Sequence, residues 1–205
     1  MQFPTANLLR GGTSIEHLQY ELFQRDLLKD EKIVWAGQPN PYILFTDADI
    51  FLVPFSLLWG GFFLFFGITA WKAGLFGLVF GLPFALLGLF AIFGRFLYKI
   101  LKKNHTYYCL SDKRALTVTT LFRRTLKTAY IDTIPLLHKS VRHDGAGTIT
   151  FGDRPSWSSW YANTGMEIFD WSHKNEAPAF YDIKDVNKVY RMVVESRCGE
   201  EPEEF

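Results

Sequence analysis

The sequence has few of the residues that would build a metal centre, a disulfide framework or an active site. Two cysteines, Cys109 and Cys198, are too few for a metal or disulfide framework. His138 and His143 lie five residues apart in or beside an expected strand, which puts them on opposite faces. No phosphate-binding Gly-Lys-Ser/Thr loop and no nucleophile elbow occur. We therefore expect no catalytic residue, no bound metal, no cofactor and no nucleic-acid partner.

The middle of the chain almost entirely lacks charge. Between Ile50 and Gly94 only Lys72 is charged, and it separates two apolar runs, 50–70 and 73–94. A helix rises about 1.5 Å per residue and crosses the roughly 30 Å hydrocarbon core of a bilayer in about 20 residues, so each run can cross once. The residues around Lys72 leave room only for a tight turn. The pattern predicts a transmembrane helical hairpin over 50–98.

The two predicted spans also lack polar groups that would serve transport. Neither contains Asp, Glu, Lys, Arg or His, the groups that line the paths of transporters and channels, so we expect an anchor. Gly77 and Gly81 form a small-xxx-small pair, which lets helix backbones approach closely in lipid. These glycines could pack the hairpin against itself or form a homo-oligomer seam.

Basic residues after the second span predict the orientation. The chain begins without the basic-then-apolar pattern of a cleavable signal, so we expect the hairpin itself to direct insertion. Four basic residues then follow the second span closely, namely Arg95, Lys99, Lys102 and Lys103. Positive charge is retained on the cytoplasmic side, so we expect both termini to be cytoplasmic.

Residues 1–31 are predicted to form a lead and an amphipathic helix. Thr13 and Glu16 have capping-box spacing, and an apolar stripe continues to about Lys29. The polar face of this helix is acidic, which favours packing against the rest of the protein over binding to anionic lipid. A short strand over 32–36 follows, and we expect the segment 32–49 to belong to the same barrel as the later strands.

The chain after His105 changes from helical periodicity to period two. Short alternating runs separated by turn residues indicate an antiparallel meander that curls into a sandwich or barrel. The expected strands are 106–110, 115–120, 125–131, 136–142 and 148–151, with 166–169 and 179–181 as further candidates.

A final helix closes the predicted domain, which covers 104–198. Asp182 is placed to cap this helix, and an apolar stripe begins at Ile183 and continues to Val193. The acidic tail, 199–205, is expected to be disordered. The predicted fold class is therefore α+β, with a transmembrane hairpin and a bent antiparallel barrel capped by a C-terminal helix.

Several local motifs resemble bacterial membrane proteins that carry a pleckstrin-homology-like domain. They are the Asp30-Glu31-Lys32 lead-in with Trp35-Ala36-Gly37-Gln38-Pro39, the strand and turn from Tyr107 to Arg114, the hairpin from Asp144 to Gly152, and the stretch from Phe180 to Tyr190. The resemblance covers roughly residues 30–195. It implies a seven-stranded, strongly bent barrel plugged by the last helix, in a protein of the bacterial inner membrane.

Basic side chains concentrate in one part of the chain. Residues 95–143 hold eleven Lys or Arg and two Asp, a net charge of +9, whereas 144–205 hold six Lys or Arg and twelve Asp or Glu, a net of −6. Each basic residue near an anionic leaflet contributes about 1 kcal/mol of attraction. Alternatively, these charges only keep turns solvated. The candidate contacts to anionic lipid or an acidic partner are Lys102, Lys103, Lys113, Arg114, Arg123, Arg124, Lys139 and Arg142.

Two classes of function remain. One is a non-enzymatic, membrane-anchored binding or scaffold module whose domain contacts anionic lipid or an acidic protein through its basic turns. The other is a structural or assembly subunit that docks onto a larger membrane complex through the hairpin and aromatic surfaces. The aromatic residues suited to an interface or to the membrane boundary are Trp157, Trp160, Tyr161 and Trp171.

Overall fold

The computed structural model describes residues 21–153, 162–166 and 177–198. The fold is α+β, with a long apolar helical stretch and two antiparallel sheets. It divides into two compact units. Among the described residues, the sheet unit comprises 21–40, 105–153 and 177–198, and the helical unit comprises 41–104 and 162–166. The apolar helices are thus an insertion within the sheet unit rather than a segment ahead of it.

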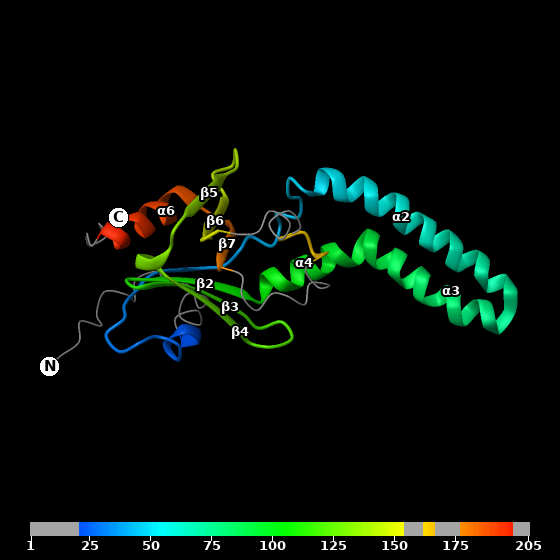
Figure 1. Cartoon of the computed structure of the whole chain (residues 1–205), viewed down its shortest axis with the longest axis horizontal. Coiled ribbons are helices and arrows are strands. Elements are labelled where there is room, and N and C mark those ends of the chain that lie inside the picture. Colours follow the sequence, from blue (N-terminus) through cyan, green and yellow to red (C-terminus); the bar gives the residue numbers. More distant parts are fainter. Residues whose placement is uncertain (1–20, 154–161, 167–176, 199–205) are drawn as a thin grey trace. The chain divides into compact units, whose positions relative to one another are not determined.

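The helical unit contains one stretch of helix that reverses direction once (Figure 1). Helices α2 and α3 pack against each other on either side of η1, which holds the exposed Lys72 at the expected turn. Among the described residues, the stretch Asp49–Asn104 alone is long and apolar enough to cross a membrane by length and composition. Of an apolar 18-residue segment within it, 17% is buried inside the protein. Its elements are α2 (Asp49–Ala70), η1 (Trp71–Ala73), α3 (Gly74–Leu89), the π-helical η2 (Phe90–Gly94) and α4 (Arg95–Asn104).

Glycines hold α2 and α3 together. A Cβ atom built on Gly88 would lie 2.5 Å from the carbonyl oxygen of Gly60, and one on Gly81 would lie 2.9 Å from that of Gly67. Gly77 is closer still, because its Cβ would lie 1.7 Å from the carbonyl oxygen of Ala70. These approaches exclude any side chain. Gly77 and Gly81 therefore pack the hairpin against itself, which is one of the two roles that the sequence left open for them.

The first sheet of the sheet unit has four antiparallel strands in the order β1-β2-β3-β4 (Figure 1). The strand before the helices pairs with the first strand after them, from Ile33 opposite Ser111 to Gly37 opposite Tyr108, as expected for 32–36. The helical insertion therefore begins and ends at neighbouring strands. The strands are β1 (Ile33–Gly37), β2 (Thr106–Ser111), β3 (Arg114–Thr119) and β4 (Thr125–Tyr130).

The second sheet has three antiparallel strands in the order β5-β6-β7, and helix α6 (Val186–Cys198) packs on β5 and β6. Gly147 makes this packing possible, because a Cβ there would lie 2.1 Å from the carbonyl oxygen of Ser140 and 2.9 Å from Val186 Cγ1. The expected strand over 166–169 lies almost wholly outside the described residues. The strands are β5 (Leu137–Val141), β6 (Gly147–Phe151) and β7 (Ala179–Ile183), and the short helix η3 (Ile131–Thr133) precedes them.

The main core of the sheet unit centres on Phe180. Its ring lies 4.7 Å from that of Phe151 and 4.8 Å from that of Tyr108, measured between centroids, so residues of both sheets meet there. The buried side of α6 completes this core with Val186, Val189 and Val193. A second cluster, formed by Phe23, Cys109, Leu116 and Val118, includes the N-terminal segment.

The predicted start of the last helix is wrong. Asp182 lies in β7 and is buried, and its backbone carbonyl accepts a hydrogen bond from the Asn40 N–H at 2.9 Å. Ile183 pairs with Gly147 in the sheet, and Asp185 has a positive φ of 51° immediately before the helix begins at Val186. Ile183 fits the apolar periodicity of both β7 and the following helix. Its pairing with Gly147 places it in the strand.

Candidate functional site

A group of buried polar contacts in the sheet unit joins the lead-in segment to the turn between β2 and β3. The Glu31 carboxylate, whose side chain is fully buried, accepts hydrogen bonds from Arg114 Nε at 3.0 Å and Nη2 at 2.6 Å. It also accepts one from the Ser111 hydroxyl at 2.5 Å and one from the Leu28 N–H at 2.7 Å. We call these groups the Glu31 clamp.

Glu31 and Arg114 are both ionised at neutral pH, because their contacts shift the pKa of each group away from neutrality. Burial acts to raise the pKa of Glu31, but the hydrogen bonds from Arg114, Ser111 and the Leu28 N–H outweigh it and lower that pKa to about 2. The bonds to Glu31 raise the pKa of Arg114. Arg114 Nη2 also donates to the Asp26 carbonyl at 2.9 Å. Arg114 is therefore a structural residue, because its side chain is buried and its Nε and Nη2 are bonded to Glu31 and Asp26; the structure does not place it on the surface as a lipid or partner contact.

The two basic turns predicted as candidate lipid or partner contacts lie at opposite ends of the first sheet. Lys113 follows β2, and its Nζ lies 3.5 Å from the Asp30 carbonyl oxygen. Arg123 and Arg124 follow β3 at its other end, because an antiparallel meander alternates its turns. The structure therefore does not bring Lys113 together with this arginine pair.

The loop between β3 and β4, residues 120–124, lies at the end of the sheet where the chain connects to the helical unit. The Thr120 N–H donates to the His105 carbonyl at 2.8 Å, and His105 is the residue that follows α4. Strand β1 also ends here, because Gly37 pairs with Tyr108 near the start of β2. The chain therefore leaves for residues 41–104 and returns from them at the same sheet end as this loop.

The tip of this loop is apolar and basic. The Phe122 side chain is 82% exposed, and Arg123 beside it is exposed and has no hydrogen bond or ion pair to the described residues. Arg124 is different, because its guanidinium forms an ion pair with the Asp26 carboxylate and donates to the Leu22 carbonyl. These bonds to Asp26 raise the pKa of Arg124. Of the predicted pair, Arg123 is the residue left for an external anion.

Two further predicted contacts belong to the second sheet. Lys139 Nζ donates to Asn187 Oδ1 at 3.0 Å and lies 4.5 Å from the centroid of the Tyr190 ring, so it joins β5 to α6. Arg142 is exposed in the turn that follows β5. The connectivity gives no reason for these two residues to share a surface with the 120–124 loop.

The basic residues of α4 are mostly turned inward within the helical unit. Arg95 Nη1 donates to Asp49 Oδ1 at 3.0 Å, and Lys99 and Lys103 donate to the backbone carbonyls of Leu44 and Ile43. Lys103 is buried, so it is not an accessible lipid contact as predicted, whereas Lys102 is half-buried. Buried basic groups are stable only with such partners.

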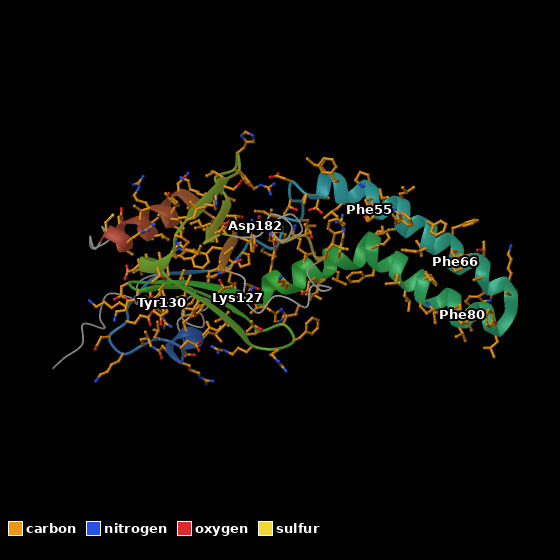
Figure 2. All side chains as sticks on the ribbon, viewed as in Figure 1. Phe55, Phe66, Phe80, Lys127, Tyr130 and Asp182 are labelled. Atoms are coloured by element: carbon orange, nitrogen blue, oxygen red, sulfur yellow. The ribbon has the colours of Figure 1, made fainter. Side chains whose placement is uncertain are left out.

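The predicted aromatic candidates, Trp157, Trp160, Tyr161 and Trp171, lie outside the described residues. Exposed aromatic rings do occur on the helices, as Figure 2 illustrates for Phe55, Phe66 and Phe80. Along α2 and α3 the sticks are almost all carbon, whereas nitrogen and oxygen atoms are frequent on the sheet unit (Figure 2).

Sequence reasoning missed Glu31 and Phe122. Glu31 carried only the weak signal of an acid beside a strand, and its partner is 83 residues away in the chain. Phe122 had a better signal, since it is an aromatic residue between a strand end and an arginine pair. Cys109 is buried, and burial raises its pKa to about 12, which makes its thiol unreactive.

No candidate catalytic group emerges from these contacts. Within the part of the chain that the structure describes, no three His, Cys, Asp or Glu side chains are grouped closely enough to hold a metal ion. Comparison with protein-family models, with curated proteins and with solved structures finds no match to this chain. The function is therefore inferred from the geometry and charges of the chain itself.

Proposed function

We propose that this protein is a non-enzymatic, membrane-anchored binding module. In this proposal α2 and α3 cross a bacterial inner membrane as a hairpin, and both termini are cytoplasmic. The sheet unit is of pleckstrin-homology type and contacts the anionic leaflet through Phe122 and Arg123. An acidic protein partner could use the same basic loop.

The exposed apolar surface of the hairpin supports the anchor. A core helix of a soluble protein is covered by the rest of that protein. In contrast, only 17% of an apolar 18-residue segment of this stretch is buried. Monomeric soluble proteins rarely expose apolar patches larger than a few hundred Å². A bilayer would cover this surface, and the single Lys72 at the turn fits the side that carries less positive charge.

The arrangement of the sheet unit supports the pleckstrin-homology assignment. Seven strands among the described residues and a closing helix are the elements that the sequence resemblance implies. The two sheets face a common core at Phe180 but pair as separate sheets rather than as a closed barrel.

The observation that carries the binding function is the 120–124 loop at the sheet end where the chain leaves for residues 41–104 and returns from them. Because the connections run to the proposed membrane hairpin, this end of the sheet is tethered toward the lipid. Burying a Phe side chain in an apolar environment gives about 1.5–3 kcal/mol, and one Arg near an anionic surface adds about 1 kcal/mol. These energies suit a contact that strengthens an existing tether.

A fluorescent label in the loop tests this contact. The full-length chain is prepared with Cys198→Ser and Phe122→Cys, labelled with NBD, and placed in nanodiscs of phosphatidylcholine with or without phosphatidylglycerol. We expect emission to shift to the blue with the anionic lipid, and to shift back in high salt or on Arg123→Glu. Lys188→Glu on α6 is the matched charge reversal and should change nothing. Water-like emission in all lipids would rule out the lipid contact.

The second candidate function is an assembly subunit of a larger membrane complex. A run of neighbouring aromatic rings on α2 and α3 favours this function. In it the ring centroids of Trp59 and Phe63 lie 6.2 Å apart, and those of Phe63 and Phe84 lie 5.7 Å apart. Aromatic residues are enriched at protein interfaces. Cross-linking in native membranes would support this function if it recovers a fixed set of partners that Phe63→Leu and Phe84→Leu together release.

A further inference from the structure

Helix α4 has a basic buried face and an apolar exposed face, the reverse of an amphipathic helix on the surface of a water-soluble protein. Its buried residues are Arg95, Lys99 and Lys103, each at most 4% exposed and spaced four residues apart along one face. Leu97 and Leu101, away from that face, are 60% and 41% exposed. A helix at a water boundary turns its charged face outward. The outward face of α4 is apolar, which indicates an apolar surrounding.

The inward direction of the basic face has a specific cause. The segment 43–49 runs beside α4 and supplies oxygen atoms to each basic side chain in turn, ending with the Asp49 carboxylate at Arg95. Asp49 is held in place by the N–H and hydroxyl of Thr46, at 2.7 and 2.8 Å. These bonds fix the rotation of α4 and leave its leucines outward.

The outward leucines continue a stripe that starts in α3. Exposed apolar residues recur every three or four positions through η2 without interruption. They are Leu82, Leu86, Leu89, Phe93, Leu97 and Leu101. At about 1.5 Å per residue, the distance from Lys72 to Leu101 is about 44 Å. That length matches a whole bilayer with its headgroup layers, about 40–45 Å, rather than the hydrocarbon core alone.

We propose that lipid covers the outward face of α4, so that the second span continues beyond Gly94 through the cytoplasmic headgroup layer. The Asp49–Arg95 pair then lies within that layer and fixes the two helix ends there. This inference rests on the proposed membrane hairpin and extends it.

Lipid fits this face better than one docked protein does. Exposed apolar residues occupy neighbouring positions, such as Ile50 with Phe51 and Phe65 with Phe66, and neighbours on a helix point about 100° apart. The apolar surroundings therefore enclose the hairpin from several sides. The stripe on α4 is continuous with that surface.

Site-specific quenching tests the inference in the full-length chain. Single cysteines replace Leu97 or Leu101 in a Cys198→Ser background, are labelled with NBD, and are placed in nanodiscs with or without a mixture of lipids that carry a nitroxide near the top or near the end of the acyl chain. Leu86→Cys in α3 is the hairpin control, and Val194→Cys, an exposed apolar position on α6, is the control outside lipid. We expect strong quenching at 86, 97 and 101 and none at 194.

The outcomes separate this inference from the proposed function. Quenching at 86 with water-like, unquenched labels at 97 and 101 would overturn the α4 inference and leave the hairpin intact. No quenching at 86 would overturn the membrane hairpin itself. Blue-shifted but unquenched labels at 97 and 101 would show a protein cover, such as a second copy, and would also overturn the lipid assignment.

Discussion

The Glu31 clamp gives a prediction whose size follows from the structure. The pKa of Glu31 falls from 4.5 to about 2 on folding. Since one pKa unit corresponds to 1.36 kcal/mol, ionised Glu31 stabilises the folded sheet unit by about 3 kcal/mol relative to the neutral acid. Glu31→Gln imitates that neutral acid. We expect it to lower the free energy of opening by about 3 kcal/mol at neutral pH, a factor of more than about 100.

Cys109 provides the assay. Its thiol is fully buried in the cluster that contains Phe23, and the clamp ties the chain next to Phe23 to the turn after β2. The clamp must open before a thiol reagent can reach Cys109. In detergent micelles and a Cys198→Ser background, the ratio of labelling rates in urea-unfolded and native protein measures the free energy of opening.

The pH dependence has a definite sign. The folded pKa of Glu31 is depressed, so its stabilisation is complete above the unfolded value of 4.5 and is lost as pH falls toward about 2. Protection of Cys109 in the wild-type chain should fall more over this range than in Glu31→Gln. Asp112→Asn is the control, since this exposed carboxylate accepts one bond, from the Lys32 N–H, and should cost under about 1 kcal/mol. Equal protection of wild type and Glu31→Gln at neutral pH would refute the reasoning.

Further substitutions test the buried ion pair, the core and the glycine contacts of the hairpin. Arg114→Ala should lower the free energy of unfolding by about 3–5 kcal/mol because it leaves a buried carboxylate unpaired, whereas Arg124→Ala at an exposed pair should cost about 1 kcal/mol or less in the same Cys109 assay. Phe180→Ala should cost about 3–5 kcal/mol, seen as a lower urea midpoint, and a loss under 1 kcal/mol would contradict its central place in the core. Gly88→Ala should lower the thermal stability of the hairpin in detergent, measured by circular dichroism, because its Cβ would meet the Gly60 carbonyl oxygen. Gly61→Ala, with no atom within 4 Å of the new Cβ, should not.

The parts of the fold that were predictable are those with a strong local period. The strands of the meander were found within one or two residues, because alternation along 106–110 or 148–151 matches one buried face. The turn at Lys72 was found because a charge interrupts a long apolar run. Both signals are contained in neighbouring residues.

The misassigned residues depended on distant partners. Arg114 looked like a solvated turn residue. It is buried because its guanidinium pairs with Glu31, which lies 83 residues earlier in the chain. Lys103 looked like a free cation beside a membrane, and the carbonyl of Ile43, 60 residues earlier, turns it inward. Charge density in a sequence therefore identified where basic residues are, but their direction was set by tertiary contacts.

The accessibility of the turn at Lys72 tests whether α2 and α3 form a membrane hairpin. In spheroplasts, a Lys72→Cys, Cys198→Ser chain is treated with a membrane-impermeant maleimide, and the unaltered chain, whose Cys198 is exposed, is treated in parallel. We expect Cys at position 72 to be labelled in intact spheroplasts, whereas Cys198 should be labelled only after the membrane is permeabilised. Labelling of Cys198 but not of position 72 before permeabilisation would contradict the proposed orientation, and recovery of the protein in the soluble fraction would contradict the hairpin itself.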